Sequence, residues 1–577
     1  MSTRQTNIDL FNYNRRPTVE VAVGGLVLGS AHPVRVQSMT NTSTMDTDGS
    51  VEQILRIVEK GGELVRLTTQ GNREAVNLGS IKEQLLARGC RVPLVADVHF
   101  NASVADTAAH YADKVRVNPG NYVDAARTFK QIDYTDAEYA DELKRLRERF
   151  VAFLDICKAE GKAVRVGVNH GSLSDRIMSR YGDTPSGVVE SCMEFLRICR
   201  DEQFNNVVVS IKTSNTSMMV ATVRRLVRVM AEEGISYPLH LGVTEAGDAE
   251  DGRIKSAVGI GALLADGIGD TLRVSLAEAP ENEIPVAKEL AEYVAQRVGH
   301  TPIEAVVAPG FCYEEPVRRK TNEFGLIGGK NVPVVVGGEA KEKDNTPDIV
   351  AGSVSLVSLD NACDTRFVAV EYKDLTVENI AKLKSLKDIA IVAYTTHNNS
   401  VGELRALVHR LTLEGIDAPV IIRRAYNEPS VESLRIKASA DLGVLLIDGL
   451  VDGLWLENTS GSADELNAIM FGILQATRAR ISKTEYIACP GCGRTMYDLQ
   501  GTLARIKAAT AHLKGLKIGV MGCIVNGPGE MADADYGYVG AARGKVSLYR
   551  RKECVEKNIP EDEAIERLLQ LIDNDRK

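Results

Sequence analysis

Eight short β-rich runs alternate with helix-like stretches between residues 34 and 276, and no other feature limits the fold as strongly. Strand and helix repeated eight times in this order predict a (β/α)8 barrel, with parallel strands inside and helices outside. The longest interval, between the fourth and fifth runs, predicts an extended charged helix. The eight runs begin at Val34, Glu63, Pro93, Lys114, Ala163, Val207, Pro238 and Asp270.

Two further domains are expected after a barrel of residues 1–280, because a chain of 577 residues exceeds the size of a single core. Residues 281–478 again alternate strand and helix, which predicts an α/β domain that resembles a degenerate barrel. Residues 479–577 predict an α+β domain with four strands and helices near Asp498 and Pro560. The strand candidates of the middle domain begin at Val332, Ile349, Arg366, Asp388, Ala418 and Leu442.

Composition excludes several classes of protein. The formal net charge of −9 argues against a general nucleic-acid binder, which needs a basic surface. No run approaches the roughly 18 apolar residues of a membrane span, and the N-terminal segment lacks the apolar stretch of a signal peptide. We therefore expect a cytoplasmic protein without nucleic-acid or membrane partners. Ten cysteines, scattered except for one Cys-x-x-Cys, favour metal or redox roles over a disulfide framework.

Cationic side chains recur within or just after the predicted barrel strands, at the end where barrels place active sites. They are Arg66, Arg116, Arg165, Lys212 and Arg273. So many cations in a net-acidic protein need counter-charge, which a diphosphate supplies through bidentate arginine contacts. We predict a polyanionic substrate, although any single cation could instead pair with an acidic residue. Polar neighbours at the same strand ends are His99, Asn118, Asn169, His240, Glu245 and Ser275.

Three of these polar neighbours have alternative interpretations. A lone histidine in an apolar strand is more often a hydrogen-bonded structural residue than an acid or a ligand. The shared position of His99 and His240 at strand ends nevertheless favours a functional role. Glu245 is either a general acid or base or a partner of one of the arginines.

The last domain carries the strongest local motif. Cys489 and Cys492 end one predicted strand, and Cys523 ends another. A structural zinc site needs four cysteine or histidine ligands, and Cys554 and His512 are awkward candidates for the fourth. Three cysteines with an open fourth position suit a 4Fe-4S cluster whose unique iron binds substrate. A redox disulfide and an incomplete zinc ribbon remain alternatives.

Eight motifs lie in order along the barrel and the last domain: VQSMTNT, ADVHF, VRVNPGN, VGVNHGSLSDR, HLGVTEAG, GIGDTLRVSL, CPGCGRT and GCIVNGPGE. Together they resemble the 4-hydroxy-3-methylbut-2-enyl diphosphate synthase family. Residues 281–478 resemble the middle domain of the long, three-domain form of that family, where the insert is thought to act as a spacer.

The resemblance implies one 4Fe-4S cluster held by Cys489, Cys492, Cys523 and Glu530. A carboxylate is a weak ligand for a thiophilic cluster and can be displaced. The implied catalytic residues are Glu530, Glu245, Asn526 and His99. The predicted substrate-binding residues, of which Ser172 comes from the resemblance alone, are Arg66, His99, Arg116, Asn118, Arg165, Asn169, Ser172, Lys212, His240, Arg273 and Ser275.

The implied reaction is the two-electron reductive opening of 2-C-methyl-D-erythritol 2,4-cyclodiphosphate to 4-hydroxy-3-methylbut-2-enyl diphosphate, in the non-mevalonate isoprenoid pathway. The protein would thus be an iron–sulfur oxidoreductase that accepts electrons from reduced flavodoxin or ferredoxin, small acidic carriers. The expected assembly is a monomer or a homodimer. A basic stretch is a candidate docking patch, although a solvated surface explains it equally: Arg543, Lys545, Arg550, Arg551 and Lys552.

The residues alone leave two other classes open. A pterin-type transferase barrel with a metal-stabilised tail would also bind a diphosphate, but it would contain no iron or acid-labile sulfide. A non-catalytic iron–sulfur scaffold or sensor would bind the cyclic diphosphate without turnover.

Overall fold

Two compact units make up the computed structural model, which describes residues 8–124, 131–362, 366–525 and 527–576. The barrel unit comprises residues 17–252, 269–288 and the described residues from 483 onwards. The insert unit comprises residues 8–16, 253–268 and 289–482. The division of the chain at residues 280 and 478 stays a prediction.

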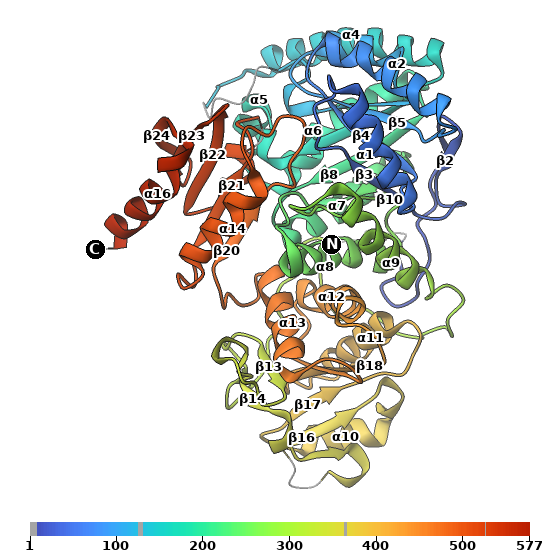
Figure 1. Cartoon of the computed structure of the whole chain (residues 1–577). Helices are drawn as coiled ribbons and strands as arrows, with labels where there is room; N and C mark the ends of the chain where they lie inside the picture. Colours follow the sequence, from blue (N-terminus) through green and yellow to red (C-terminus); the bar gives the residue numbers. More distant parts are fainter. Residues whose placement is uncertain (1–7, 125–130, 363–365, 526, 577) are drawn as a thin grey trace. The chain divides into compact units, whose positions relative to one another are not determined.

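Eight parallel strands form the centre of the barrel unit (Figure 1). They are β3 (Arg35–Met39), β4 (Leu64–Thr69), β5 (Leu94–Val98), β6 (Lys114–Val117), β7 (Ala163–Asn169), β8 (Val207–Lys212), β9 (His240–Leu241) and β10 (Thr271–Leu272). They pair in the order β8-β7-β6-β5-β4-β3-β10-β9, and a parallel bridge between Val209 and Leu239 closes the ring. Each predicted run contains one of these strands, so the predicted (β/α)8 barrel is confirmed.

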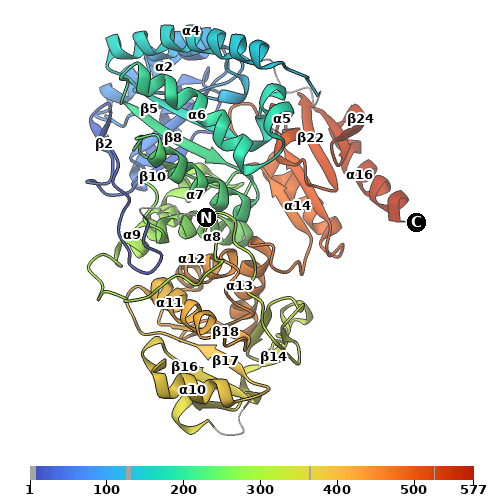
Figure 2. The ribbon, with the colours of Figure 1, turned by 180° about the vertical axis from the view of Figure 1, so that it is seen from behind.

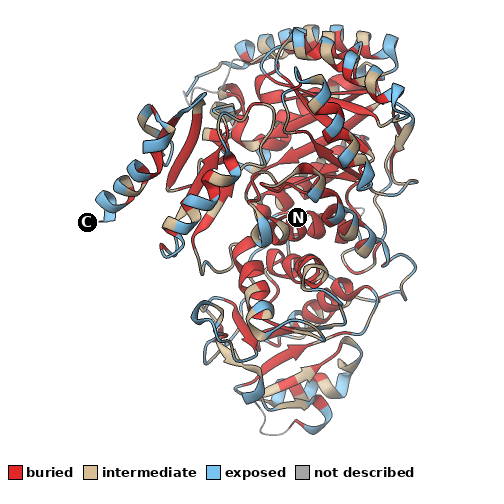
Figure 3. Cartoon of the chain, in the orientation of Figure 1, coloured by how far each residue is buried: buried red, intermediate tan, exposed pale blue. Residues whose placement is uncertain are grey.

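Helices pack around these strands (Figure 2): α1 (Thr47–Glu59), α2 (Asn72–Ala87), α3 (Ala102–Ala109), α4 (Asp136–Glu160), α5 (Asp175–Tyr181), α6 (Pro185–Asp201) and α7 (Thr216–Glu232). Helix α4 is the predicted extended charged helix. It begins at a capping box made by Thr135 and Glu138, and it ends at Gly161, which adopts a left-handed conformation. Figure 3 shows buried strands and exposed outer helix faces, as expected for helices that cover a barrel.

An antiparallel hairpin closes the amino-terminal end of the barrel. Its strands are β1 (Val21–Val23) and β2 (Leu26–Leu28). The buried side chains of the hairpin pack against apolar residues at the starts of the barrel strands, among them Leu64 and Ala163. The opposite end, where the strands finish, is instead lined by polar and charged side chains.

The insert unit contains a parallel sheet of β13 (Val334–Gly337), β14 (Ile349–Val350), β15 (Leu356–Ser358), β16 (Phe367–Val370), β17 (Ala390–Ala393), β18 (Val420–Tyr426) and β19 (Gly453–Asn458). No pairing joins its edge strands, β14 and β15, among the described residues. A hairpin of β11 (Glu323–Phe324) and β12 (Ile327–Gly328) packs against the sheet through Phe324 and Ile327. A half-barrel with a hairpin agrees with the predicted degenerate barrel. The helices are α10 (Val377–Ser385), α11 (Ser400–Leu413), α12 (Val431–Ile447), α13 (Ala463–Ala476) and parts of α8 (Ala249–Ala265) and α9 (Glu283–Ala295).

One predicted strand of the insert is wrong. The apolar run that starts at Leu442 forms the second half of α12, in which all residues from Ala438 to Ile447 are buried. A helix buried on all sides has no polar face, so its apolar run cannot be told from a buried strand by periodicity. The strand between β13 and β18 in the sheet is β19, which was not predicted.

A mixed five-stranded sheet forms the C-terminal part of the barrel unit. Its strands are β20 (Glu485–Ala488), β21 (Lys517–Met521), β22 (Tyr536–Ala542), β23 (Lys545–Arg550) and β24 (Glu553–Pro560), with helices α14 (Leu499–Thr510), α15 (Gly527–Glu530) and α16 (Glu561–Arg576). The first three strands are parallel, and β23 and β24 pair antiparallel, which confirms the predicted α+β class. Four strands were predicted, and the fifth, β24, was not. None of the helices in the described ranges is long and apolar enough to cross a membrane.

Candidate active site

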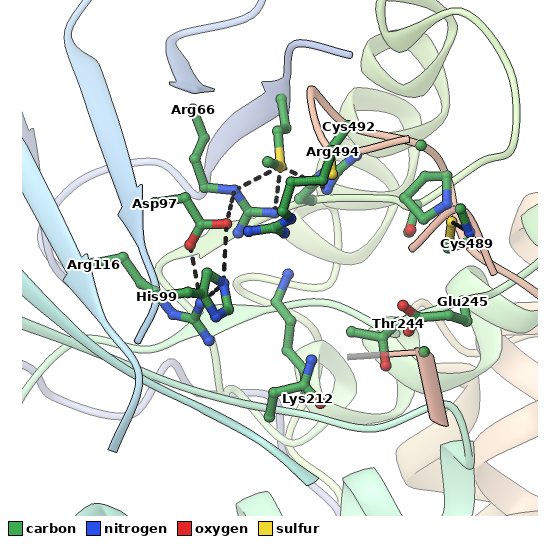
Figure 4. Close-up of a pocket in the computed structure, with 18 of the residues that line it drawn as sticks. Arg66, Asp97, His99, Arg116, Lys212, Thr244, Glu245, Cys489, Cys492 and Arg494 are labelled. Carbon is green, nitrogen blue, oxygen red and sulfur yellow. Dashed lines mark hydrogen bonds and ion pairs between the residues drawn. The ribbon is translucent and has the colours of Figure 1, made fainter. Parts of the chain in front are cut away.

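A pocket at the carboxyl ends of the barrel strands brings together side chains of the barrel and of the C-terminal sheet (Figure 4). All five predicted cations line it, and so do the three predicted cysteine ligands. Asp97, Thr244 and Arg494, which were not predicted, also line it. The predicted residues in the lining are Arg66, His99, Arg116, Arg165, Asn169, Lys212, Glu245, Arg273, Ser275, Cys489, Cys492 and Cys523.

Asp97 on β5 is the carboxylate around which three of the arginines gather. Its Oδ1 accepts a hydrogen bond from Nη1 of Arg116 at 3.0 Å and lies 3.8 Å from Nη2 of Arg165. Nε of Arg66 is 3.9 Å from Oδ2. Burial raises the pKa of Asp97, but Arg66 and Arg116 hold it well below its usual value. One negative charge therefore faces three guanidinium groups, and the surplus positive charge favours an anionic ligand.

Several donor atoms of these cations have no partner in the described structure. Nε of Arg116, together with Nε and Nη1 of Arg165, is buried and makes no hydrogen bond there. Burial and the neighbouring cations hold the pKa of Arg165 and of Lys212 well below the usual values. A buried donor without a partner costs about 1–3 kcal/mol. The oxygen atoms of a diphosphate would satisfy such donors.

Arg273 differs from the other cations because the barrel itself neutralises it. Its Nε and Nη2 donate to the two carboxylate oxygens of Glu283 at 2.9 and 2.8 Å. Burial lowers the pKa of Arg273, but Glu283 and other nearby acidic groups together raise it above its usual value. The sequence left open whether a cation at a strand end pairs with an acidic residue. Arg273 is such a cation, because it pairs with Glu283.

His99 is a neutral imidazole between charged groups. Nη1 of Arg116 lies 2.6 Å from its Nε2, and because a guanidinium can only donate, Nε2 accepts this bond. Burial, Arg116 and Arg494 lower the pKa of His99 to about 3. The proton of the neutral ring therefore lies on Nδ1, a buried atom without a partner among the described residues. His99 can donate one hydrogen bond to a ligand.

The remaining predicted barrel residues do not line the pocket. His240 is buried inside the barrel, where its Nδ1 accepts a hydrogen bond from Nε2 of Gln37 at 2.9 Å. Asn118 donates to Oγ of Ser172 at 2.8 Å and joins the loops after β6 and β7. Asn526 lies outside the described residues.

The cysteines follow two parallel strands, so their loops meet at one edge of the C-terminal sheet. The backbone N–H of Gly522 donates to Sγ of Cys489 at 3.2 Å. Burial raises the pKa of Cys489 and of Cys523, so these thiols need a bound cation to ionise at neutral pH. Three sulfurs with a backbone donor are a suitable donor set for an iron–sulfur cluster. The described residues contain no group of three or more His, Cys, Asp or Glu side chains already arranged as a metal site.

Glu530 at the end of α15 does not line the pocket. Instead it makes hydrogen bonds with two residues of the barrel. Its Oε2 accepts a hydrogen bond from Oγ1 of Thr244 at 2.9 Å, and its backbone carbonyl accepts one from Oγ of Ser214 at 3.1 Å. Burial, followed by the nearby carboxyl of Glu245, raises the pKa of Glu530 well above its usual value. Burial also raises the pKa of Glu245. Two buried neighbouring carboxyls disfavour double ionisation, so a proton is retained between them.

Two glycines allow the loop that carries Glu530 to touch the barrel. The barrel side of this contact is the short 3-10 helix η2 (His170–Ser172). A Cβ on Gly529 would lie 1.7 Å from the carbonyl oxygen of Gly171, and a Cβ on Gly171 would lie 2.5 Å from the backbone nitrogen of Glu530. Any side chain at either position would therefore push the loops apart.

The sequence could have indicated some of the unpredicted pocket residues but not others. Asp97 stands two residues before His99, and the alternation of a strand places both side chains on the inner face. Thr244 is next to Glu245 in sequence, but no spacing rule selects it. Arg494 follows Cys492 by two residues, and only the fold brings it to the barrel arginines.

Comparison with known proteins decides the family. A family model described as GcpE TIM-barrel domain matches residues 18–288, and one described as GcpE protein C-terminal domain matches residues 485–574. A protein of Bacteroides thetaiotaomicron named 4-hydroxy-3-methylbut-2-en-1-yl diphosphate synthase (flavodoxin) is 58% identical over 99% of each chain. This chain belongs to the 4-hydroxy-3-methylbut-2-en-1-yl diphosphate synthase family.

Relatives of the same name in other genera also match this synthase family member along its length. The protein of Porphyromonas gingivalis is 49% identical over 98% of each chain. That of Chlorobaculum tepidum is 39% identical over 98% of this chain and 89% of its own. These matches include the insert, as expected for the long form of the synthase family. The solved dihydropteroate synthase of Xanthomonas albilineans is only weakly similar, with 16% identity over 49% of this chain and 99% of its own, and a TM-score of 0.31.

Proposed function

We infer that this protein reductively opens 2-C-methyl-D-erythritol 2,4-cyclodiphosphate to 4-hydroxy-3-methylbut-2-enyl diphosphate. The observation that carries this inference is one pocket in which five barrel cations face three cysteines. The cations suit a diphosphate, and the thiols suit a redox cofactor. A pterin-type transferase needs no redox cofactor, and an iron–sulfur scaffold needs no cationic pocket. The relatives' shared name, a synthase of the product, supports the same reaction.

We propose that Cys489, Cys492 and Cys523 hold one 4Fe-4S cluster, with Glu530 as a displaceable fourth ligand. The Gly522 N–H that donates to Cys489 supports this assignment, because backbone donors tune cluster sulfurs. A bound cluster supplies single electrons, which acid–base side chains cannot do. Thr244 gives the Glu530 carboxylate an alternative hydrogen-bond partner on the barrel.

The barrel residues bind and orient the substrate. Arg66, Arg116, Arg165 and Lys212 contact the diphosphate oxygens. Arg116 and Arg165 do so through buried donors that have no partner among the described residues. His99 donates through Nδ1, while Arg273, Asn169 and Ser275 complete the wall of the pocket. Asn118 and Ser172 hold the neighbouring loops in place, and His240 supports the barrel interior. Asn526 is proposed to act beside the cluster.

Glu245 is the proposed proton donor. Burial raises the pKa of its carboxyl, which favours the protonated form. That proton can pass to the substrate oxygen that leaves as water, so that electrons enter from the cofactor side and a proton from the barrel side.

Access to the pocket requires movement of the C-terminal sheet. The cavity measures about 100 Å³, whereas ligand sites commonly measure about 300–1,000 Å³. We propose that the C-terminal sheet moves away from the barrel to admit substrate and returns for the reaction. The insert would act as a spacer that lets one chain close on itself, in a cytoplasmic monomer or homodimer.

Turnover under strong reductant tests this function. The anaerobically purified protein is incubated with the cyclodiphosphate, dithionite and methyl viologen, and products are identified by mass spectrometry. We expect the linear allylic diphosphate, and no product from Cys489→Ser. Binding of the cyclodiphosphate without product in a cluster-loaded sample would support the scaffold alternative and contradict the proposed reaction.

A further inference from the structure

An exposed apolar pair lies beside the cysteine loops. Ile524 directly follows Cys523 and is 56% exposed, and Met496 is 37% exposed. The backbone N–H of Met496 donates to the carbonyl of Gly522 at 3.1 Å, so the loops that carry these side chains lie together. Neither side chain lines the pocket. A protein interface usually has an apolar core surrounded by a polar rim, and this pair would supply part of such a core beside the proposed redox site.

Two basic residues stand at the same end of the C-terminal sheet. Because β20, β21 and β22 are parallel, the cysteine loops and the turn after β22 lie at one edge (Figure 1). Gly540 near the end of β22 packs closely on Gly522, since a Cβ there would lie 2.4 Å from the Gly522 carbonyl oxygen. Arg543 and Lys545 follow within five residues, and both are exposed.

The other basic residues of the predicted stretch lie at the opposite end. Strand β23 runs antiparallel to β22 and separates Lys545 from Arg550 by roughly 17 Å, at about 3.3 Å per residue. Arg550 is also paired with Asp575 at 2.7 Å. The stretch predicted as one patch is therefore two groups, and Arg551 and Lys552 belong to the group that is remote from the cysteines.

We propose that Met496, Ile524, Arg543 and Lys545 form the docking surface for reduced flavodoxin, a small acidic flavoprotein. An apolar centre with a basic edge complements an acidic partner and steers its approach. Two successive one-electron transfers would oxidise flavodoxin and reduce the enzyme. The surface is separate from the pocket, so a docked carrier does not block the substrate. This inference rests on the proposed function.

A pair of double charge reversals tests the surface. The first variant combines Arg543→Glu with Lys545→Glu, and the matched control combines Arg551→Glu with Lys552→Glu. For each holoenzyme, the rate of cyclodiphosphate reduction is measured with reduced flavodoxin and with dithionite at low and high ionic strength. Titration with oxidised flavodoxin measures binding without turnover. Ile524→Glu examines the apolar centre in the same assays.

We expect the ratio of the flavodoxin-driven to the dithionite-driven rate to fall at least about 10-fold in the first variant and in Ile524→Glu. The deficit of the first variant should shrink at high salt, since screening weakens exposed charge interactions. The control should stay within about twofold of the unaltered enzyme. An equal deficit in both double variants, or an unchanged ratio in the first, would contradict the inference. Failure of the unaltered enzyme with dithionite would instead refute the proposed function.

Discussion

Replacement of Gly171 by alanine tests whether activity requires the close contact between the barrel and the loop that carries Glu530. The added Cβ would lie 2.5 Å from the backbone nitrogen of Glu530 and 2.7 Å from the carbonyl carbon of Gly529. An ordinary contact needs about 3.4 Å or more, so the loop must retreat by roughly 1 Å. A misplacement of about 1 Å between reacting groups can cost about 100-fold in rate. We therefore expect kcat/KM to fall about 100-fold.

The assay is steady-state reduction of the cyclodiphosphate by dithionite and methyl viologen. The backbone of Gly171 does not require glycine, so the barrel itself should keep its thermal stability. Gly25→Ala is a matched control, because a Cβ at Gly25 meets no atom within 4 Å. A normal kcat/KM in Gly171→Ala would show that the close contact is not needed for activity. Loss of activity together with an unfolded barrel would show that the substitution acts on stability and not on the position of the loop.

Four further predictions concern single side chains. Thr244→Val should lower kcat/KM by up to about 10-fold, because it removes a hydrogen bond of roughly 0.5–1.5 kcal/mol to the Glu530 carboxyl, and Thr244→Ser should restore activity. Lys212→Met should raise KM for the cyclodiphosphate about 10-fold or more, as steady-state kinetics would show. The folded pKa of His99 is about 3 and an unfolded histidine titrates near 6.5, so only the unfolded chain binds this proton between those pH values. The free energy of unfolding should thus fall by about 2 kcal/mol from pH 7 to pH 5, and His99→Asn should lose this component in urea unfolding. Asp441→Ala strips the carboxylate from the buried Arg297 and should destabilise the insert unit by about 3–5 kcal/mol in thermal unfolding, without a change in KM.

Local pattern was sufficient for the barrel and for most of its pocket. Each barrel strand is a short β-rich run followed by polar residues, and the rule that barrels place chemistry at strand ends selected Arg66, Arg165 and Lys212. The rule works because strand alternation fixes which side chains point inward. The same rule also selected His240, which does not line the pocket. Strand alternation shows which side chains point inward but not how deep along the barrel axis they lie.

Other features depend on tertiary structure and had no local signal. The run at Leu442 resembles a strand because α12 is buried on all sides. Arg494 enters the pocket, and Thr244 meets Glu530, only because the C-terminal sheet seats on the barrel. The basic stretch that ends at Lys552 looked continuous because the sequence does not show that β23 carries the chain from one end of the sheet to the other.

The most direct test of the account is iron and acid-labile sulfide analysis of anaerobically purified protein, followed by reaction of the same sample with the cyclodiphosphate and dithionite. We predict about four irons and about four sulfides per chain, with conversion to the linear allylic diphosphate. Zinc in place of iron, or a complete cluster that binds the cyclodiphosphate without converting it, would contradict the claim that the barrel cations and the three cysteines form one redox site.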